Sequence, residues 1–433
     1  MALGGGVFVT QNKVLPGSYI NFVSAAKASV TLADRGIAAL PLSLDWGKEG
    51  EVITLTSEDF FENAKELLGY DYTHDKMKGL RDVFKNAQKV FVYKLNTGVK
   101  AANTYCTAKF GGIRGNDLKT VIQKNVNDQT KYDVKTLLGN TVIDVQTVAA
   151  ASGLVDNDFV TFKTTATLEV TASTPLTGGT NGSNVTGEDW TKAFSALDAY
   201  SFNTLGIVST DDDIKGLAIS YTKRMRDEVG VKFQTVVYNK AADDKGIINV
   251  INKVGGIDSA DAVYWVTGAE AGCQVNKSVT NKVYDGDFDI TVSYDQSTLE
   301  DAINSGKFVF HKVGDEIRVL TDINSKVTVT EEEGSDFKSN QTIRVLDQIA
   351  NDIAVIFNTK YLGQIPNDTS GRVSLWSDIV DHHQQLETIR AIENFDSGLV
   401  TVSQGKTKKD VVVSDAVTPT NAMERLYMQV VVS

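Results

Sequence analysis

Apolar residues run almost to both ends of this chain of 433 residues. An apolar strand pattern ends one residue before the final serine, and a shorter apolar stretch lies near the start. Chain termini are ordinarily polar and frayed, whereas an unpaired apolar strand exposes its side chains and its backbone edge. We therefore expect both segments to add to a sheet, in their own subunit or in a neighbouring one. The expected strand residues are Val7, Phe8, Val9, Tyr427, Met428, Val430, Val431 and Val432.

Length and composition indicate several globular domains. The length exceeds what one hydrophobic core usually supports. A hydrophobic content of 42% is enough to build such cores. The net charge of −12 argues against a general nucleic-acid binder and against docking on an anionic membrane. No apolar run approaches the ~18 residues of a membrane span, and the start of the chain shows no secretory signal. Cys106 and Cys273 are too few and too far apart for a disulfide framework or a zinc site, so we expect two free thiols.

Helix and strand signals alternate in residues 18–95 and again in residues 176–334. Thr56 and Asp59 have the spacing of a capping box for a helix that stops at Gly69, and Thr186 and Asp189 repeat that spacing. The expected later elements are strand Val90–Tyr93, strand Leu205–Val208, helix Asp213–Val229, strand Val231–Tyr238, helix Ile247–Val254 and strand Ala262–Val266. This alternation predicts one α/β domain with a largely parallel or mixed sheet covered by helices. Turns at Asp285-Gly286 and Gly314-Asp315 predict two hairpins, the second pairing Phe308–His311 with Ile317–Leu320.

Residues 96–175 interrupt this alternation and predict an inserted all-β domain. The expected strands are Tyr132–Leu137, Val142–Val148, Phe159–Lys163 and Thr167–Thr171. The chain leaves the insertion through the glycine-rich segment Leu176–Gly182. That segment lacks the lysine of a P-loop, so we expect a hinge at Gly178, Gly179 and Gly182 instead of a phosphate cradle.

Residues 335–433 predict a C-terminal α+β domain. One helical stripe comprises Ile343, Leu346, Ala350, Ile353 and Phe357, and a second comprises Leu375, Ile379, His382, Leu386 and Ile389. Strands Gly398–Ser403 and Val411–Val413 flank a basic turn, Lys406–Lys409, and the strand Tyr427–Val432 ends the chain. Two helices beside so short a sheet would accept strands from elsewhere. The basic turn is expected to be a solvated hairpin tip, with contact to an acidic neighbouring subunit as the alternative.

Candidate chemical motifs all have a simpler explanation. Asp211–Asp213 follows a strand and opens a helix, where capping and the helix dipole favour acidic residues without any metal or phosphate. His382 could share a metal with Asp378, but packing or surface polarity is the favoured interpretation of His382 and His383. Trp190, Trp265, Trp376 and Tyr427 fit core or interface anchors. The sequence therefore predicts no catalytic, cofactor-binding or metal-binding residues.

Four short segments, in order along the chain, carry a family resemblance. They are Pro16–Phe22, Ala108–Asn116, Leu176–Gly182 and Ala422–Met428. Together they resemble contractile phage tail sheath proteins, of the type found in phages, defective prophages and phage-tail-like bacteriocins of Gram-positive bacteria. The four segments occur in order and span almost the full length of the chain.

The resemblance implies a helical polymer of stacked hexameric rings around an inner tube, contracting without a nucleotide. It implies that residues 335–433 form the innermost domain, which receives strands from the arms of neighbouring subunits, residues 1–17 being the N-terminal arm. The inserted domain would face outward. The implied partners are other copies of the chain, the inner tube protein, and baseplate and tail terminator proteins, in a virion tail or phage-tail-like particle assembled in the bacterial cytoplasm.

Two other functions remain open. A cytosolic α/β enzyme or ligand-binding protein could use the sheet of residues 205–266, although this leaves the terminal strands unexplained except by self-pairing or dimer swapping. A sheath of a type VI or extracellular injection system would differ in biological setting more than in physics.

Overall fold

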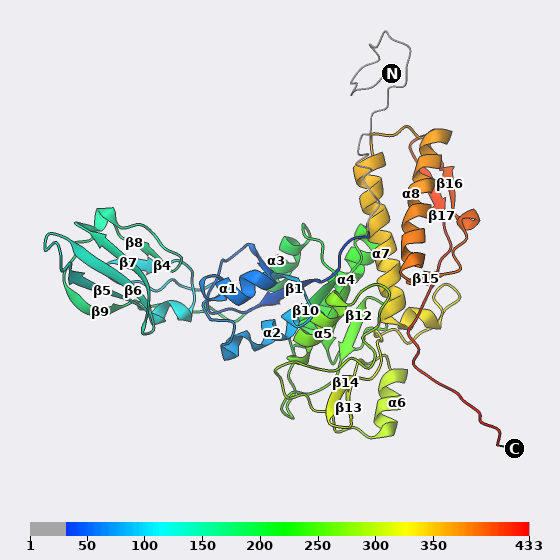
Figure 1. Ribbon diagram of the computed structural model, residues 1–433, viewed down its shortest axis with the longest axis horizontal. Helices are drawn as coiled ribbons and strands as arrows, with labels where there is room; N and C mark the ends of the chain where they lie inside the picture. The colour runs from blue at the N-terminus through cyan, green and yellow to red at the C-terminus, as the bar shows by residue number, and fades with distance from the viewer. Residues whose placement is uncertain (1–31, 433) are drawn as a thin grey trace, which may run out of the picture.

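The computed structural model describes residues 32–432, which form an elongated molecule (Figure 1). A helix-covered sheet lies in the middle, and a β module projects from one side of it (Figure 1). Two long helices stand on the other side, where the C-terminal segment leaves the body (Figure 1).

The central sheet has six strands in the order β12-β11-β10-β1-β3-β2. These strands are β1 (Ile37–Leu42), β2 (Val52–Thr56), β3 (Lys89–Lys94), β10 (Thr204–Ile207), β11 (Gln234–Tyr238) and β12 (Ile247–Val250). Neighbouring strands are parallel except β2, which runs antiparallel to β3. Strands from before and after the inserted residues thus share one mixed sheet, as predicted.

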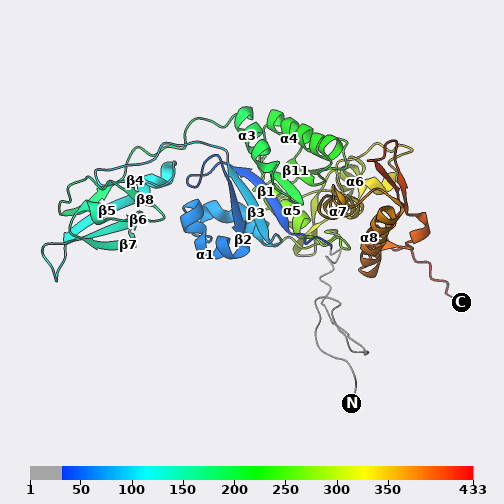
Figure 2. The ribbon, with the colours of Figure 1, turned by 90° about the horizontal axis from the view of Figure 1, so that it is seen from above.

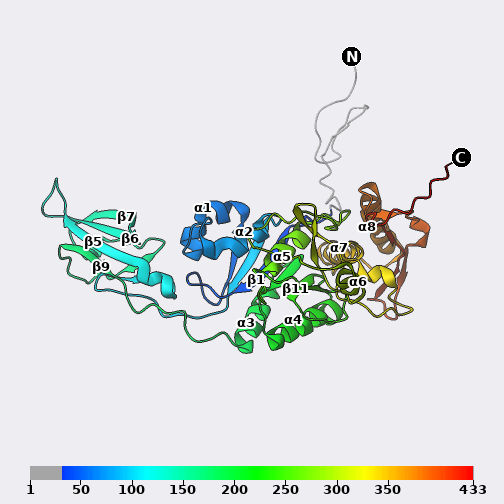
Figure 3. The same cartoon turned by 90° about the horizontal axis from the view of Figure 1, so that it is seen from below.

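Helices cover both faces of this sheet (Figures 2 and 3). One face carries α1 (Ser57–Leu68), α2 (Lys78–Phe84) and α5 (Ala262–Gly272), and the other carries α3 (Gly187–Leu197) and α4 (Asp212–Arg224). Alternate residues of β1 point to opposite faces of the sheet and belong to different hydrophobic cores. Ala38 and Leu40 lie in the core that contains Phe60, whereas Ala39 lies in the core that contains Trp190. The predicted capping boxes are present at the starts of α1 and α3.

Two assignments in this region were wrong. Ile247–Val254, predicted as a helix, contains strand β12, and Ala262–Val266, predicted as a strand, begins helix α5. Helix α5 is buried between the sheet and α2, and Trp265 is fully buried. A helix that is buried on all sides lacks the alternation that distinguishes it from a buried strand.

The inserted residues form a β-sandwich module. Strands β5 (Leu118–Lys124), β6 (Tyr132–Leu138), β7 (Thr141–Val148) and β9 (Thr171–Pro175) make one sheet, and β4 (Cys106–Ala108) pairs with β8 (Val160–Phe162). The predicted strand Thr167–Thr171 was misplaced. Leu168 is buried there without belonging to a strand, so its alternation with polar residues was misleading.

Helix α6 (Gln296–Asn304) and a hairpin of β13 (Phe310–Val313) and β14 (Glu316–Val319) follow α5 in the chain, before the C-terminal helices. The hairpin turns at Gly314, as predicted, and pairs Phe310 with Val319. The hairpin predicted at Asp285-Gly286 is absent from residues 32–432. Asp285 instead accepts a hydrogen bond from Trp265 Nε1 at 2.8 Å, which fixes this loop through a side chain.

The C-terminal region contains α7 (Asn340–Ile356) and α8 (Thr369–Thr388). Two small two-stranded sheets accompany them, β15 (Ile392–Glu393) with β18 (Thr418–Pro419) and β16 (Thr401–Gln404) with β17 (Val411–Ser414). The predicted strand Gly398–Ser403 begins later than expected, because Ser397–Leu399 forms a 3-10 turn.

Candidate functional site

The chain ends in an extended segment, residues 423–432, which we call the C-terminal arm (Figure 1). Its apolar side chains have exposed fractions of 102% for Met423, 87% for Leu426, 88% for Tyr427, 76% for Met428, 70% for Val430, 82% for Val431 and 90% for Val432. Tyr427 is therefore no core anchor of its own subunit. Exposed apolar surface of this extent is typical of interaction sites, and the role of the arm as an interface stays a prediction.

The root of the C-terminal arm is held by hydrogen bonds. Strand β18 pairs with β15, and the Ala422 amide donates to Gln341 Oε1 at 2.9 Å. The Glu424 carboxylate accepts from Thr280 Oγ1 at 2.7 Å and from Thr321 Oγ1 at 3.0 Å. The arm thus starts from a fixed point between α7 and the α/β domain, and the described part of the chain offers the rest of the arm no hydrogen bond.

The hairpin of β16 and β17 has two free edges, because it contains only two strands. On β17, Val412 is 52% exposed and Val413 is 40% exposed. A groove of about 530 Å³ lies beside β16 and is lined by Val373 and Trp376 of α8 together with Val402. Free apolar edges of this kind can template another strand.

Helix α8 fixes this hairpin and the segment after it. Trp376 Nε1 donates to the Val400 carbonyl at 2.9 Å, which confirms Trp376 as a packing anchor. The turn Lys406–Lys409 is exposed at the hairpin tip, where the Asn367 amide donates to the Asp410 carbonyl at 2.8 Å.

His382 and His383 are fully buried and form a bridge between α7 and the segment after β17. Nε2 of His382 lies 3.0 Å from Asp352, and Nε2 of His383 lies 2.6 Å from Asp415. The two Nδ1 atoms are 3.2 Å apart. Of the two favoured interpretations, packing is confirmed and surface polarity was wrong, because both rings are buried and link protein groups to one another.

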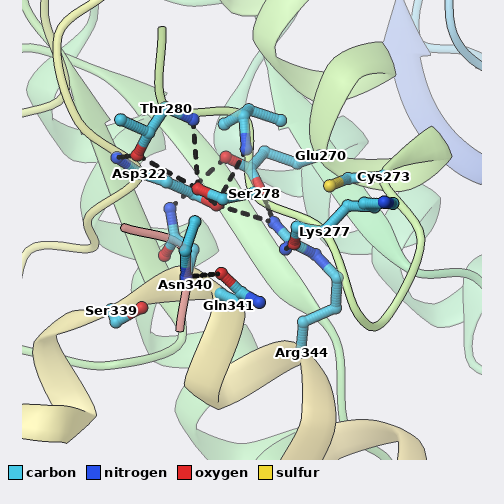
Figure 4. Close-up of polar contacts among 12 residues, drawn as sticks. Glu270, Cys273, Lys277, Ser278, Thr280, Asp322, Ser339, Asn340, Gln341 and Arg344 are labelled. Atoms are coloured by element: carbon cyan, nitrogen blue, oxygen red, sulfur yellow. Dashed lines mark hydrogen bonds and ion pairs between the residues drawn. The ribbon is translucent and has the colours of Figure 1, made fainter. Parts of the chain in front are cut away.

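Helix α7 is seated on the α/β domain by polar side chains (Figure 4). Arg344 donates from Nη2 to Glu270 Oε2 at 2.6 Å and to Asp322 Oδ2 at 3.2 Å, and from Nη1 to the Lys277 carbonyl at 2.7 Å. Glu270 and Arg344 are each 1% exposed, and Asp322 is 2% exposed. We call Glu270, Asp322 and Arg344 the charged triad.

Further contacts extend this seat along α7. Arg226 and Asp347 form a buried bidentate ion pair with distances of 2.6 and 2.7 Å. Asn351 Nδ2 donates to the Lys232 carbonyl at 2.8 Å. The contacts of residues 340–351 with the α/β domain are called the α7 seat below.

The charged triad has a marked electrostatic asymmetry. Burial and the neighbouring Asp322 raise the pKa of Glu270 to about 8. Burial alone would also raise the pKa of Asp322, but Arg344 and the hydrogen bonds that Asp322 accepts hold it below its ordinary value. Burial works against the charge of Arg344, yet Cys273, Asp322 and Glu270 raise its pKa. Of the two carboxyl groups, Glu270 is therefore the one whose pKa favours a bound proton.

The two predicted arms differ in what can be observed. Val7, Phe8 and Val9 lie outside the described residues. The segment Tyr427–Val432, predicted as a strand, is extended but unpaired within the described chain. Its pairing with a neighbouring subunit stays a prediction.

The predicted glycine hinge lies where the β module joins the α/β domain. Gly182 has a φ of 76°, and a Cβ there would stand 1.8 Å from the Thr97 carbonyl oxygen. Gly178 has a φ of 82°, and a Cβ on Gly179 would lie 2.6 Å from the Gly112 carbonyl oxygen. These glycines permit close backbone crossings, while movement at this point stays a prediction.

The acidic run before α4 caps that helix. Asp211 Oδ1 accepts from the Asp213 amide at 2.8 Å, as the capping interpretation predicts. A pocket of about 380 Å³ lies at the carboxyl ends of β1 and β10, where α/β proteins often bind ligands, and Asp211 lines it. The cap already occupies the amides that could hold an anion, which disfavours a nucleotide at this place.

Asp378, the other residue considered as a metal ligand, accepts from Lys360 Nζ at 2.6 Å and from Tyr361 Oη at 2.5 Å. Among residues 32–432, no three His, Cys, Asp or Glu side chains are grouped to hold a metal ion. No helix in the same range is long and apolar enough to cross a membrane.

The α7 seat was missed from the sequence. The apolar stripe predicted for α7 was only partly right, because Leu346 and Ala350 are half-buried whereas Asn340, Arg344 and Asp347 are buried. A signal was present, since Asn340, Arg344, Asp347 and Asn351 recur at helical spacing. A polar stripe of this kind ordinarily indicates a solvent-facing side.

Four sheath domain families match successive parts of the chain. They are the tail sheath protein Gp18 domain III N-terminal region at residues 35–95, the phage tail sheath protein beta-sandwich domain at 96–181, the phage tail sheath protein central domain at 183–325 and the phage tail sheath C-terminal domain at 332–433.

Known proteins agree with these matches. The phage-like element PBSX protein XkdK of Bacillus subtilis (strain 168) is 32% identical, with 100% of both chains covered. The crystal structure of a sheath tail protein from Desulfitobacterium hafniense is 36% identical, with a TM-score of 0.84 over 94% of this chain and 98% of that one. The contracted helical sheath of the anti-feeding prophage shares the fold, with a TM-score of 0.56 at 12% identity over 97% and 99% of the chains. The resemblance found in the sequence is confirmed, and the chain belongs to the phage tail sheath protein family.

Proposed function

We propose that this chain is the structural subunit of a contractile tail sheath, which polymerises as stacked hexameric rings around an inner tube and contracts to drive the tube through a bacterial envelope. Membership of the sheath family supports this function, as does the fold shared with a sheath in its contracted state. The observation that carries the proposal is the C-terminal arm, whose apolar side chains are at least 70% exposed, in a chain whose β16–β17 hairpin has free edges.

Subunits are joined by exchanged strands in this proposal. A strand of about five residues makes several backbone hydrogen bonds, each contributing a net ~0.5–1.5 kcal/mol. Burying two or three Val or Tyr side chains adds roughly 1.5–3 kcal/mol apiece before the entropy of ordering is subtracted. Each arm would therefore be a firm but flexible tether, while the faces between rings exchange one set of contacts for another.

The domains take different places in this assembly. Residues 335–433 would form the inner polymerisation domain, and residues 1–17 the second arm. Residues 18–95 with 176–334 would form the middle domain, and residues 96–175 would face outward, joined at the hinge of Gly178, Gly179 and Gly182. The projecting β module supports the outer placement (Figure 1).

The partners would be other copies of this chain, the inner tail tube protein, the baseplate and the tail terminator. We assign no nucleic-acid partner, no insertion into a membrane and no enzymatic activity, because the family is a structural one. The energy of contraction would be stored in the packing of the extended state. The particle would be a phage tail or a phage-tail-like bacteriocin, assembled in the bacterial cytoplasm.

Negative-stain microscopy of concentrated purified protein tests this function. Rods or rings are expected from the sheath subunit. Uniform small particles that bind a nucleotide would contradict the proposal and favour an α/β enzyme or ligand-binding protein using residues 205–266.

A second experiment tests the outer placement of the β module. Replacing residues 96–175 with a short Gly-Ser linker should preserve the folding of the remainder and the assembly of tubes. Loss of the whole fold would show that the module belongs to the core. Removing the module exposes Trp46, which packs with it. The deletion is therefore also made together with Trp46→Ser, so that an exposed tryptophan does not make the remainder insoluble.

A further inference from the structure

The two carboxyl groups of the charged triad lie side by side, because both accept from the same nitrogen, Arg344 Nη2. They are almost completely buried, with exposed fractions of 1% for Glu270 and 2% for Asp322. Two ionised carboxylates that share one donor repel each other strongly in a buried site, whereas one shared proton removes the repulsion.

A second observation indicates where that proton lies. Asp322 Oδ1 is buried and has no donor among the hydrogen bonds of the described chain. Asp322 Oδ2, by contrast, accepts from Arg344, from Ser278 Oγ at 3.1 Å and from the Val279 amide at 3.1 Å. A protonated Glu270 would supply the donor that Oδ1 lacks, since buried polar atoms are ordinarily paired.

Other charged groups around Glu270 do not replace this proton. Arg35, on the segment before β1, donates to the backbone carbonyls of Cys273 and Glu270 at 2.8 and 3.1 Å. These hydrogen bonds do not involve the side-chain carboxyl group of Glu270. Asp347, on α7, is paired with Arg226. Burial raises the pKa of the Cys273 thiol to about 11, so that thiol is neutral at physiological pH.

A chain of hydrogen bonds connects the triad to the C-terminal arm, and its members Ser278, Thr280 and Asp322 are drawn in Figure 4. Ser278 Oγ donates to Asp322, and the Thr280 amide donates to Ser278 Oγ at 3.1 Å. Thr280 Oγ1 accepts from the Asp322 amide at 2.9 Å and donates to Glu424 at 2.7 Å. The residue that fixes the arm root is therefore linked directly to the segment that holds Asp322.

We propose that Glu270 and Asp322 share one proton beneath Arg344, and that loss of this proton loosens both the α7 seat and the root of the C-terminal arm. The shared proton makes the joint between the α/β domain and the C-terminal region responsive to pH. This property belongs to the single subunit, so it holds whether or not subunits exchange strands.

The sign of the pH effect follows from Glu270. Its pKa is about 8 in the folded chain, above the ordinary value of 4.5. The folded state therefore holds a proton that the unfolded state has released. The stability contributed by this group is fully present below the ordinary value and is lost as the pH rises through about 8.

Hydrogen exchange of the purified full-length subunit tests this proposal. Amide protection in residues 340–351 and 418–424 should fall by about tenfold or more between about pH 6 and about pH 9, after correction for the intrinsic pH dependence of exchange. Protection in the β module should stay unchanged. Equal protection of the α7 seat at both pH values would overturn the proposal, and this result needs no variant.

Glu270→Gln sharpens the test, because the amide donates to Asp322 and accepts from Arg344 without an ionisable proton. In this variant, amide protection at the α7 seat should change less than about threefold over the same pH range. Glu62→Gln, at an exposed position of α1, should behave as wild type. If Glu270→Gln keeps the full pH response, the proposal is wrong. Should that variant not fold, infrared spectra of the wild type decide, because the protonated carboxyl band must disappear between the same two pH values.

Discussion

Helix α7 and the C-terminal arm depart from the ordinary distribution of side chains in opposite directions. The α7 seat buries Arg344, Asp347 and other polar residues, whereas the arm exposes valines, methionines and a tyrosine. A buried charge is tolerated only when an opposite charge or hydrogen-bonding groups pair with it. An exposed apolar strand is tolerated only when another strand or subunit covers it. The charges of the seat therefore have their partners within one subunit, and the apolar residues of the arm do not.

The largest effect should come from breaking the seat. Arg344→Ala leaves Glu270 and Asp322 buried without their cation, so we expect the free energy of unfolding to fall by about 3–5 kcal/mol. Arg425→Ala, at an exposed position of the arm, is the matched control and should change it by less than about 0.5 kcal/mol. Urea unfolding followed by tryptophan fluorescence measures both. Equal losses of unfolding free energy in the two variants would show that the α7 seat contributes no more to stability than the arm does.

A smaller effect is expected in the bridge between the C-terminal helices. His382→Ala leaves Asp352 buried without its ring partner, which should cost about 1–3 kcal/mol. Exchange protection of residues 340–347 should stay unchanged, because the α7 seat holds them independently. His311→Ala, on the partly exposed strand β13, is the control for thermal unfolding. Loss of protection throughout α7 would mean that the bridge and the seat form one unit.

The smallest effect concerns the root of the arm. Glu424→Gln weakens the bonds from Thr280 and Thr321, and we expect less than about 1 kcal/mol in stability because the site is exposed. Proteolysis at the arm root should nevertheless become several-fold faster. Glu393→Gln, on strand β15, provides the control. An unchanged cleavage rate would show that β18 alone fixes the root.

The sequence predicted the α/β domain, the inserted β module and the α8 stripe, because amphipathic periodicity and capping residues are local signals. It failed at α5, where burial on all sides removes periodicity, and at β12, which is too short to identify. It also failed at the α7 seat. Arg344 finds Glu270 and Asp322 only through tertiary contacts, and a polar helical stripe gives no sign that it will be buried.

The C-terminal arm was found because its pattern conflicts with its position at the chain end. Tyr427 and Val430 have strand-forming side chains where termini are usually polar. Whether such a strand pairs within its own subunit depends on distances that a sequence does not contain. In the described chain it finds no pairing partner.

Truncation of the arm tests the central claim most directly. Deleting Leu426–Ser433 removes the exposed apolar residues of the arm except Met423, and it leaves Glu424 and the root intact. We predict a soluble subunit with an unchanged thermal midpoint that sediments as a monomer, and no tubes by negative-stain microscopy. Removing Ser433 alone should leave polymerisation unaffected. Tubes like those of the full chain, formed by the truncated subunit, would contradict the account.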